Sequence, residues 1–197
     1  MESNLKFDII PFGNIVKLKS GFAFKSESWQ NKGIPVIKIA NISEELNMND
    51  CSYVSENNIN YAREFTAYEG DIIIAMTGAT LGKFCLIPPH NGTILINQRV
   101  GKLFPVSSHK MLNILPYIYC MLSNPEIINE LINLGSGSAQ PNISGNDFNN
   151  IHIKYNENFF TKFNKKYNIV FKYILENIYI IEKLNHLKQL YLKKFFG

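Results

Sequence analysis

Cysteine is scarce in this chain, and its placement excludes two kinds of scaffold. The sequence of 197 residues contains only three cysteines, which are far apart and form no C-x-x-C pair: Cys51, Cys85 and Cys120. An odd number of cysteines at such spacing supports neither a disulfide framework nor a zinc site. We therefore expect a protein of a reducing compartment that folds without a metal ion.

Long apolar runs are also missing. No stretch approaches the roughly 18 consecutive apolar residues of a membrane-spanning helix. No positively charged start leads into a short apolar segment, which is the pattern of a secretion signal. The sequence therefore favours a cytoplasmic protein with no membrane partner. Its hydrophobic fraction of 46% is enough for one sizeable core, so we expect one domain with an appendage.

Familiar catalytic motifs are absent as well. Residues 77–83 (TGATLGK) superficially resemble a nucleotide-binding loop, but three residues instead of four separate the glycines, and Phe84 stands where such a loop carries Ser or Thr. No nucleophile elbow occurs, and residues 88–90 (PPH) lack the Asn or Asp and the aromatic residue of an adenine methyltransferase. The histidines are too widely spaced for a metal site: His90, His109, His152 and His186. We expect no cofactor and no catalysis by this chain alone.

Positive charge is concentrated at one end of the sequence. Residues 1–153 hold eleven Lys and Arg against thirteen Asp and Glu, whereas residues 154–197 hold nine Lys against three Glu. The net charge is thus −2 in the first part and +6 in the second. Such a distribution is compatible with a nucleic-acid partner without proving one, because a globular part with no bulk positive charge binds DNA only through local contacts.

Local patterns indicate a mixed α+β domain. Runs rich in β-branched or aromatic residues and bounded by Gly, Pro and Asn predict strands at residues 34–40, 71–76, 84–87, 93–104 and 151–155. Apolar residues at helical spacing predict helices at 109–122 and 125–134, the second beginning with Pro125 after Asn124 as N-cap. Residues 135–145 have the Gly, Ser, Asn and Pro content of an irregular loop.

A different period begins near Phe159 and predicts one long helix. Without Gly or Pro before Gly197, this helix would span about 35 residues and about 50 Å. Its apolar stripe advances in steps of three or four residues: Phe163, Tyr167, Val170, Ile174, Ile178, Ile181, Leu184, Leu187, Tyr191 and Phe195. We expect the helix to project from the domain; the alternative is a kinked helix that folds back over the domain's own core.

Five blocks of sequence carry a resemblance to a known family. They are residues 21–25 (GFAFK), 33–42 (GIPVIKIANI), 70–83 (GDIIIAMTGATLGK), 97–101 (NQRVG) and 135–144 (GSGSAQPNIS). In this order and at this spacing, they resemble the target recognition domain in the specificity subunits of type I restriction-modification enzymes. The likeness covers roughly residues 8–155, and the helix that follows resembles the spacer helices of that family.

The resemblance implies a fold and a division of labour. The fold would be α+β, with a mixed-sheet target recognition domain in residues 1–155 and a long, coiled-coil-forming spacer helix in residues 156–197. The chain would be a DNA sequence-specificity subunit that reads a half-site in duplex DNA. Chemistry would be left to a methyltransferase subunit and a motor-nuclease subunit. Family members usually carry two recognition domains and two spacer helices, whereas this sequence contains one of each.

Candidate DNA-contacting residues lie in these blocks. Base reading needs paired donors and acceptors, while hydroxyls and lysines fix the register on phosphates. The first group comprises Gln98, Arg99, Gln140 and Asn142, and the second comprises Lys25, Lys38, Thr77, Thr80, Lys83, Ser136 and Ser138. Alternatively, because members of the family read different sequences, the shared residues of the first group would brace the loops or contact the DNA backbone, and residues 44–68 would carry the base readers. Residues 77–83 are equally compatible with a plain hairpin turn that carries a solvated lysine.

Two further functions stay open at the level of sequence. One is a protein-interaction module that docks on a methyltransferase without touching DNA, and the other is an inactive or truncated specificity cassette. The terminal stripe contains too much apolar surface to leave in water. We therefore expect the helix to pair with the same helix of a second copy, running antiparallel, which would give a homodimer with a recognition domain at each end.

Overall fold

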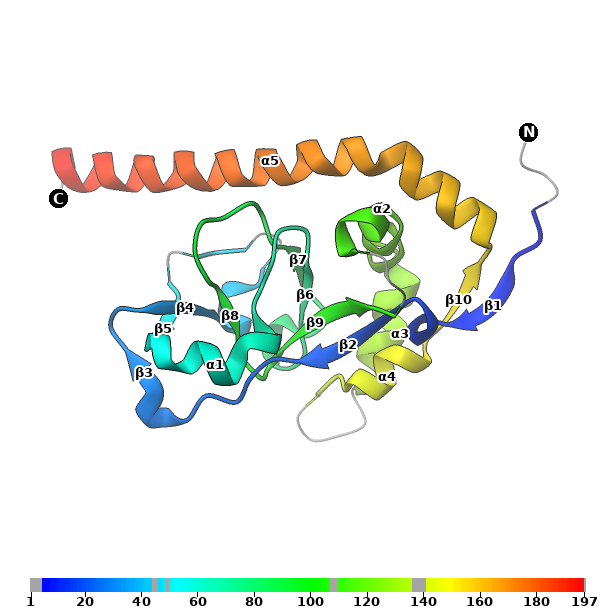
Figure 1. Ribbon diagram of the computed structural model, residues 1–197, viewed down its shortest axis with the longest axis horizontal. Helices are drawn as coiled ribbons and strands as arrows, with labels where there is room; N and C mark the ends of the chain where they lie inside the picture. Colours follow the sequence, from blue (N-terminus) through cyan, green and yellow to red (C-terminus); the bar gives the residue numbers. More distant parts are fainter. Residues whose placement is uncertain (1–4, 44–45, 49, 107–109, 136–140, 197) are drawn as a thin grey trace.

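The computed structural model describes residues 5–43, 46–48, 50–106, 110–135 and 141–196. Within these ranges the chain forms ten β-strands: β1 (Asp8–Pro11), β2 (Val16–Ser20), β3 (Trp29–Gln30), β4 (Ile34–Ile37), β5 (Ser52–Val54), β6 (Ile72–Ala75), β7 (Phe84–Leu86), β8 (Leu95–Ile96), β9 (Val100–Pro105) and β10 (His152–Tyr155). It also forms five α-helices: α1 (Ile59–Ala62), α2 (Met111–Leu122), α3 (Pro125–Gly135), α4 (Gly145–Asn150) and α5 (Glu157–Phe196). Figure 1 shows the strands and short helices as one body, with α5 lying along one edge of it.

The described strands form three sheets. One is antiparallel throughout, in the order β2-β9-β6-β7, and a second has the order β3-β5-β4-β8, in which β4 and β8 are parallel. The third is the ribbon of β1 and β10, in which Asp8 pairs with Tyr155. Because β10 leads directly into α5, this ribbon ties the origin of the long helix to the beginning of the domain (Figure 1).

Strand β6 is buried on both of its faces. Ile72 and Ile74 point into the largest hydrophobic cluster, which also contains residues of β2, α2, α3, α4 and α5. Ile73 and Ala75 point the opposite way, into a second cluster. All four side chains are fully buried, as the continuous apolar run of this strand requires. The strand therefore lies at the centre of the domain, with a separate core on each side.

The first half of α5 belongs to the domain core. Phe160, Phe171 and Leu175 are buried in the largest cluster, so the expectation of a projecting helix is corrected for this half. Pro116 lies inside α2 and has no N–H of its own. The N–H of the next residue, Tyr117, donates to the side-chain oxygen of the buried Asn164, at 3.0 Å. None of the described helices has the length and apolar character needed to cross a membrane.

The elements expected from the sequence are largely confirmed, with shifted ends. The strands at 71–76 and 84–87 and the helices at 109–122, 125–134 and 159 onward all have counterparts. The strand expected at 34–40 ends at Ile37, because residues 39–41 form the 3-10 turn η3 (Ile39–Asn41). The strand expected at 93–104 is divided in two by a turn in which the N–H of Val100 donates to the carbonyl of Asn97.

A buried ion pair holds the segment before β6 against the sheet. The ammonium of Lys102 lies 2.5 Å from a carboxylate oxygen of Asp71, and both side chains are almost fully buried. The ammonium also donates to the carbonyl of Thr66 at 2.7 Å and lies over the rings of Tyr68 and Phe104. Burial raises the pKa of Asp71 above its ordinary value, and Lys102 opposes that shift. Removing the lysine would thus leave a carboxylate buried with no counter-charge.

We predict that Lys102→Met lowers the free energy of unfolding by about 3 kcal/mol at neutral pH, because breaking a buried pair leaves an uncompensated charge. Since the pKa of the unpaired carboxyl is raised in the folded state, the loss grows above the unfolded pKa and is smaller near pH 4. The matched control is Lys19→Met, which removes an exposed pair with Glu64 and should cost less than about 1 kcal/mol. Urea unfolding followed by circular dichroism measures both; equal losses would contradict the prediction.

Candidate nucleic-acid interface

The turn between β6 and β7 has the backbone geometry that its glycines allow. Gly78 and Gly82 both have a φ of +79°, as expected from the turn. The N–H of Gly82 donates to the carbonyl of Ala75, and the N–H of Ala75 donates to the carbonyl of Lys83. Gly82 also packs so closely on α3 that an added Cβ would lie 3.0 Å from the side chain of Ile132. The turn is therefore held from both sides, and Lys83 is exposed at its end.

Three segments that are distant in sequence meet at the end of β6. The N–H of Met76 donates to the carbonyl of Arg99 at 3.0 Å. The N–H of Ile143 donates to the carbonyl of Met76 at 2.9 Å, and Thr77 forms a β-bridge with Asn142. The side chains of Arg99 and Asn142 are exposed and that of Thr77 is half-buried. The structure thus brings together, at the end of β6, the backbones of the three segments that carry these predicted contact residues.

Gln98 precedes Arg99 in the turn between β8 and β9. Its N–H donates to the carbonyl of Phe22 at 2.9 Å, and its side chain is exposed. The approach of the two segments depends on Gly21, where a Cβ would lie 2.3 Å from the carbonyl oxygen of Ile96. Asn97 is buried and its side-chain oxygen accepts from the N–H of Arg99 at 3.4 Å. Sequence reasoning missed the positioning role of Asn97, although its place in the NQRVG block was the signal.

Thr80 and Lys38 are linked through the 3-10 turn η3. The hydroxyl of Thr80 donates to the carbonyl of Ile39 at 3.4 Å. The ammonium of Lys38 lies 3.6 Å from the centre of the Trp29 ring, a cation–π contact that leaves the side chain half-buried. Lys38 is therefore held on an aromatic ring rather than extended. Trp29 gave no signal in the sequence, because the contact depends on the pairing of β3 and β4 with β5.

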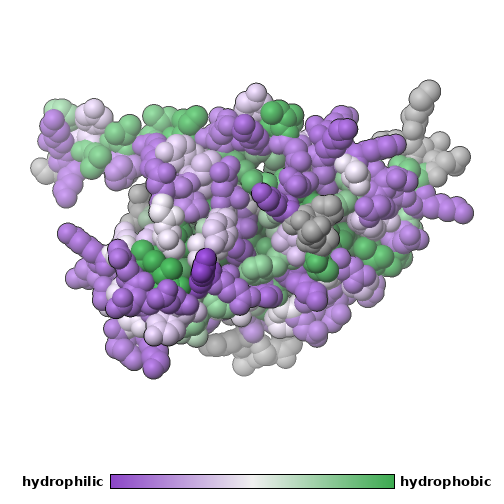
Figure 2. All heavy atoms as spheres, in the orientation of Figure 1, coloured by the Kyte–Doolittle hydropathy of each residue, from purple (hydrophilic) through white to green (hydrophobic). Residues whose placement is uncertain are grey.

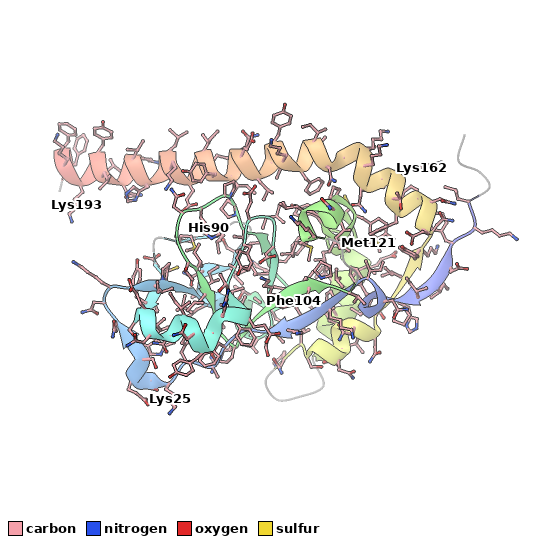
Figure 3. All side chains as sticks on the ribbon, in the orientation of Figure 1. Lys25, His90, Phe104, Met121, Lys162 and Lys193 are labelled. Carbon is pink, nitrogen blue, oxygen red and sulfur yellow. The ribbon has the colours of Figure 1, made fainter. Side chains whose placement is uncertain are left out.

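Lys25 lies at the edge of the molecule that faces away from α5, as Figure 3 shows. The residue before it, Phe24, contacts the ring of Trp29, with ring centres 5.5 Å apart. Among the described residues, the ion pairs are Lys19 with Glu64 and Lys102 with Asp71. Lys25, Lys83 and Arg99 are thus exposed cations without an acidic partner in that part of the chain. The remaining candidates, Ser136, Ser138 and Gln140, lie outside the described residues.

The stripe predicted along the terminal helix divides into two groups. One group is half-buried and, apart from Tyr167, packs against the largest core cluster of its own domain: Phe163, Tyr167, Ile174 and Ile178. The other is exposed: Val170, Ile181, Leu184, Leu187, Tyr191 and Phe195. Further apolar side chains that the sequence stripe omitted are also exposed on this helix: Ile169, Tyr173, Ile180, Leu190 and Leu192. Figure 2 shows hydrophobic atoms recurring along α5.

The sequence of this chain matches the family model of the type I restriction modification DNA specificity domain over residues 4–189. The chain therefore belongs to this family, which agrees with the resemblance carried by the five blocks. No curated protein matches it.

Solved structures of the same family share the fold. The type I restriction-modification system S subunit from M. genitalium has a TM-score of 0.60 and 20% identity, covering 98% of this chain and 46% of that one. The HsdS subunit from Thermoanaerobacter tengcongensis has a TM-score of 0.53 and 16% identity, covering 93% and 41%. A chain from a structure on complex assembly and conformational transition of the type I R-M system has a TM-score of 0.56 and 16% identity, covering 98% and 44%. This chain thus spans less than half the length of these relatives.

We predict that Gly82→Ala destabilises the protein more than Gly92→Ala does. Both glycines have a positive φ, so each substitution costs roughly 1 kcal/mol in backbone strain. Only at Gly82 does the new Cβ also press on Ile132, whereas at Gly92 nothing lies within 4 Å. Thermal unfolding of the two variants gives the difference. An equal shift would show that the turn is not braced by α3.

Proposed function

We propose that this chain reads one half of a bipartite target in duplex DNA and leaves the chemistry to other subunits. The observation that carries the proposal is the meeting, at the end of β6, of the segments that carry Gln98, Arg99, Thr77 and Asn142, in a chain that belongs to the specificity-domain family. These side chains come from three separate segments, and backbone hydrogen bonds hold the segments together. A rigid set of donors and acceptors is what reading base edges requires.

Each kind of side chain on this surface has a separate task. Arg99 pairs with guanine through two donors, and Gln98 and Asn142 pair with adenine through a donor and an acceptor. Lys25 and Lys83 neutralise phosphates, together with the hydroxyls of the turn. No acidic side chain among the described residues forms an ion pair with these cations, so the phosphates need not displace one.

The partners that complete the activity are a methyltransferase subunit and a motor-nuclease subunit. This chain contributes no catalysis of its own, because its sequence contains none of the catalytic or cofactor-binding motifs considered above. Lys25 lies at the edge of the molecule that faces away from α5 (Figure 3). The helix is therefore free to hold protein partners while the opposite edge lies on DNA.

A second copy of the chain supplies the other half of the target. The solved relatives are more than twice as long as the part of them that this chain covers. The outer side of α5 exposes apolar side chains that the same helix of a second copy would cover. Among them, Leu184 is 59% exposed and Leu187 is 47% exposed. Two copies paired through α5 would carry a recognition domain at each end, so the target would be palindromic with an unread spacer.

We predict that Lys25→Ala weakens binding to every duplex and lowers the slope of log K against log salt by about 1, because one phosphate contact is lost. Gln98→Ala should instead relax the preference at one base pair by about 1–3 kcal/mol. The control is Lys162→Ala, at the opposite edge of the molecule (Figure 3). Fluorescence anisotropy on duplexes selected from a random pool measures all three. If the native chain binds no duplex, with or without the methyltransferase, the proposal is contradicted and the chain is a protein-interaction module.

We predict that the native chain is a dimer in light scattering at micromolar concentration and that Leu184→Asp converts it to a monomer. The aspartate would place a charge in an apolar contact, whereas the domain fold should be unaffected because Leu184 touches no core cluster. Lys172→Asp, on the same helix but away from the stripe, should leave the dimer intact. A native chain that stays monomeric at high concentration would contradict the dimer and the palindrome together.

A further inference from the structure

The outward face of α5 has a seven-residue repeat. Val170, Asn177, Leu184 and Tyr191 form one series, and Tyr173, Ile180, Leu187 and Lys194 form the other. Two such series, three or four residues apart, form the contact seam of a coiled coil. All the apolar members are between 46% and 59% exposed. The seam is therefore uncovered over about three heptads.

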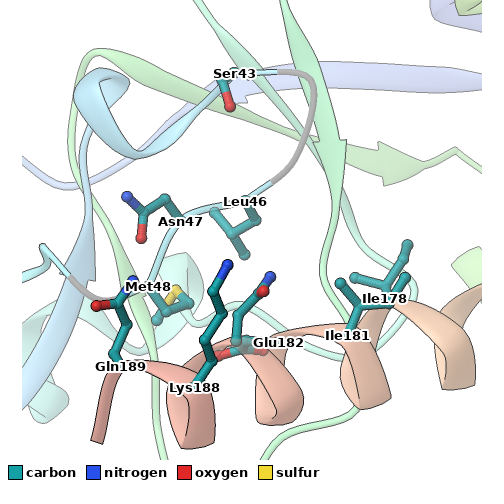
Figure 4. Close-up of a pocket in the computed structure, with 10 residues that line it drawn as sticks. Ser43, Leu46, Asn47, Met48, Ile178, Ile181, Glu182, Lys188 and Gln189 are labelled. Atoms are coloured by element: carbon teal, nitrogen blue, oxygen red, sulfur yellow. The ribbon is translucent and has the colours of Figure 1, made fainter. Parts of the chain in front are cut away.

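The seam lies opposite the face that α5 turns toward its own domain. Buried Phe171 and Leu175 occupy the domain face in the first half of the helix. In the second half this face lines a groove with Ser43 and residues 46–48, to which Glu182, Asn185 and Gln189 contribute beside Ile178 and Ile181 (Figure 4). At about 100° per residue, Leu184 and Tyr191 point away from that groove. One helix thus presents a face to its own domain and a separate face to a partner.

Two opposite charges flank the seam on one side, and Lys188 follows the second series on the other side. Glu176 and Lys183 each precede a residue of the first series by one position, are seven residues apart and are both exposed. In an antiparallel helix pair, residues at this flanking position face the same position of the partner. The shift of one helix along the other therefore decides which residue of the partner each charge faces.

We propose that a second copy of the chain docks on this seam in one antiparallel register, which is set by Glu176 facing the partner's Lys183 and Lys183 facing the partner's Glu176. The proposal rests on the dimer proposed above. The two-fold axis then passes between Ile178 and Tyr179. Val170 lies opposite the partner's Leu187, and Tyr173 lies opposite the partner's Leu184.

The neighbouring arrangements bring like charges together. A shift by one heptad in one direction places Glu176 against the partner's Glu176, and a shift in the other direction places Lys183 against the partner's Lys183. A parallel pair would set Lys183 against the partner's Lys188, because in that arrangement each flanking residue meets one five positions further on. Like charges at these positions oppose association, so the proposed register alone contains two attractive contacts and no repulsive one from these residues.

Apolar flanking residues agree with the same register. Ile169 lies on the same side of the seam as Glu176 and would meet the partner's Leu190. These side chains are 55% and 52% exposed in the single chain, so pairing would bury both. Asn177 is the one polar residue inside the seam, apart from Lys194 at its end, and would lie opposite the partner's Ile180. A single polar residue in a seam lowers stability and disfavours other registers.

The test exchanges the two charges. Glu176→Lys and Lys183→Glu, each alone, replace two attractions by two repulsions and should weaken the homodimer about tenfold. The double variant Glu176→Lys/Lys183→Glu should restore the native dissociation constant within about threefold. A mixture of the two single variants should form heterodimers in preference to either homodimer, because both contacts are then attractive. Lys172→Glu, the same change of charge outside the seam, is the control, and analytical ultracentrifugation measures the constants.

Cysteine cross-linking reads the register directly. In a Cys120→Ser background, whose other two cysteines are buried, a chain with Tyr173→Cys should cross-link to a chain with Leu184→Cys. It should not cross-link to Asn177→Cys or Tyr191→Cys, which neighbouring registers would require. If the charge changes leave the dissociation constant unaltered, or if Tyr173→Cys cross-links to Asn177→Cys or Tyr191→Cys, the proposed register is wrong although the dimer exists. A monomeric native chain overturns both, and DNA binding by anisotropy is scored separately.

Discussion

The burial of β6 on both faces is the constraint on which the rest of the structure depends. Its four residues supply alternate side chains to two cores, so the strand cannot slide or rotate without exposing one of them. The residue that follows, Met76, therefore has a fixed position, and its N–H and carbonyl bind the backbones of Arg99 and Ile143. Exposed side chains on irregular segments are in this way held by the most deeply buried strand of the domain.

Much of this fold could be predicted from the sequence where one element carries its own signal. The run of apolar residues in β6, the glycines of the following turn and the long period of α5 are signals of this kind. Strands β1, β2, β3 and β5 were not predicted. Of these, β1, β3 and β5 are short and partly polar and exist only through distant partners, as Asp8 pairs with Tyr155. The division of β8 from β9 depends on buried Asn97, whose tertiary contacts outweigh a local preference for strand.

The candidate site was predictable as a set of residues but not as a surface. Blocks of sequence named Gln98, Arg99 and Asn142, whereas only the hydrogen bonds of Met76 show that two of them are neighbours. The extent of the apolar stripe on α5 could be predicted, but not which of its residues pack on the chain's own domain. Spacing of three or four residues does not distinguish a face buried on the helix's own domain from a face left outside, and here the same helix carries both.

The cation–π contact between Lys38 and Trp29 gives the protein a built-in optical reporter. Trp29 is the sole tryptophan of the chain, so its emission comes from one known place. An ammonium 3.6 Å from the ring centre perturbs the excited indole, and any phosphate that draws the lysine away changes that perturbation. The segments that meet around Trp29 thus carry their own spectroscopic signature, which needs no attached dye and separates events at this edge of the domain from events along α5.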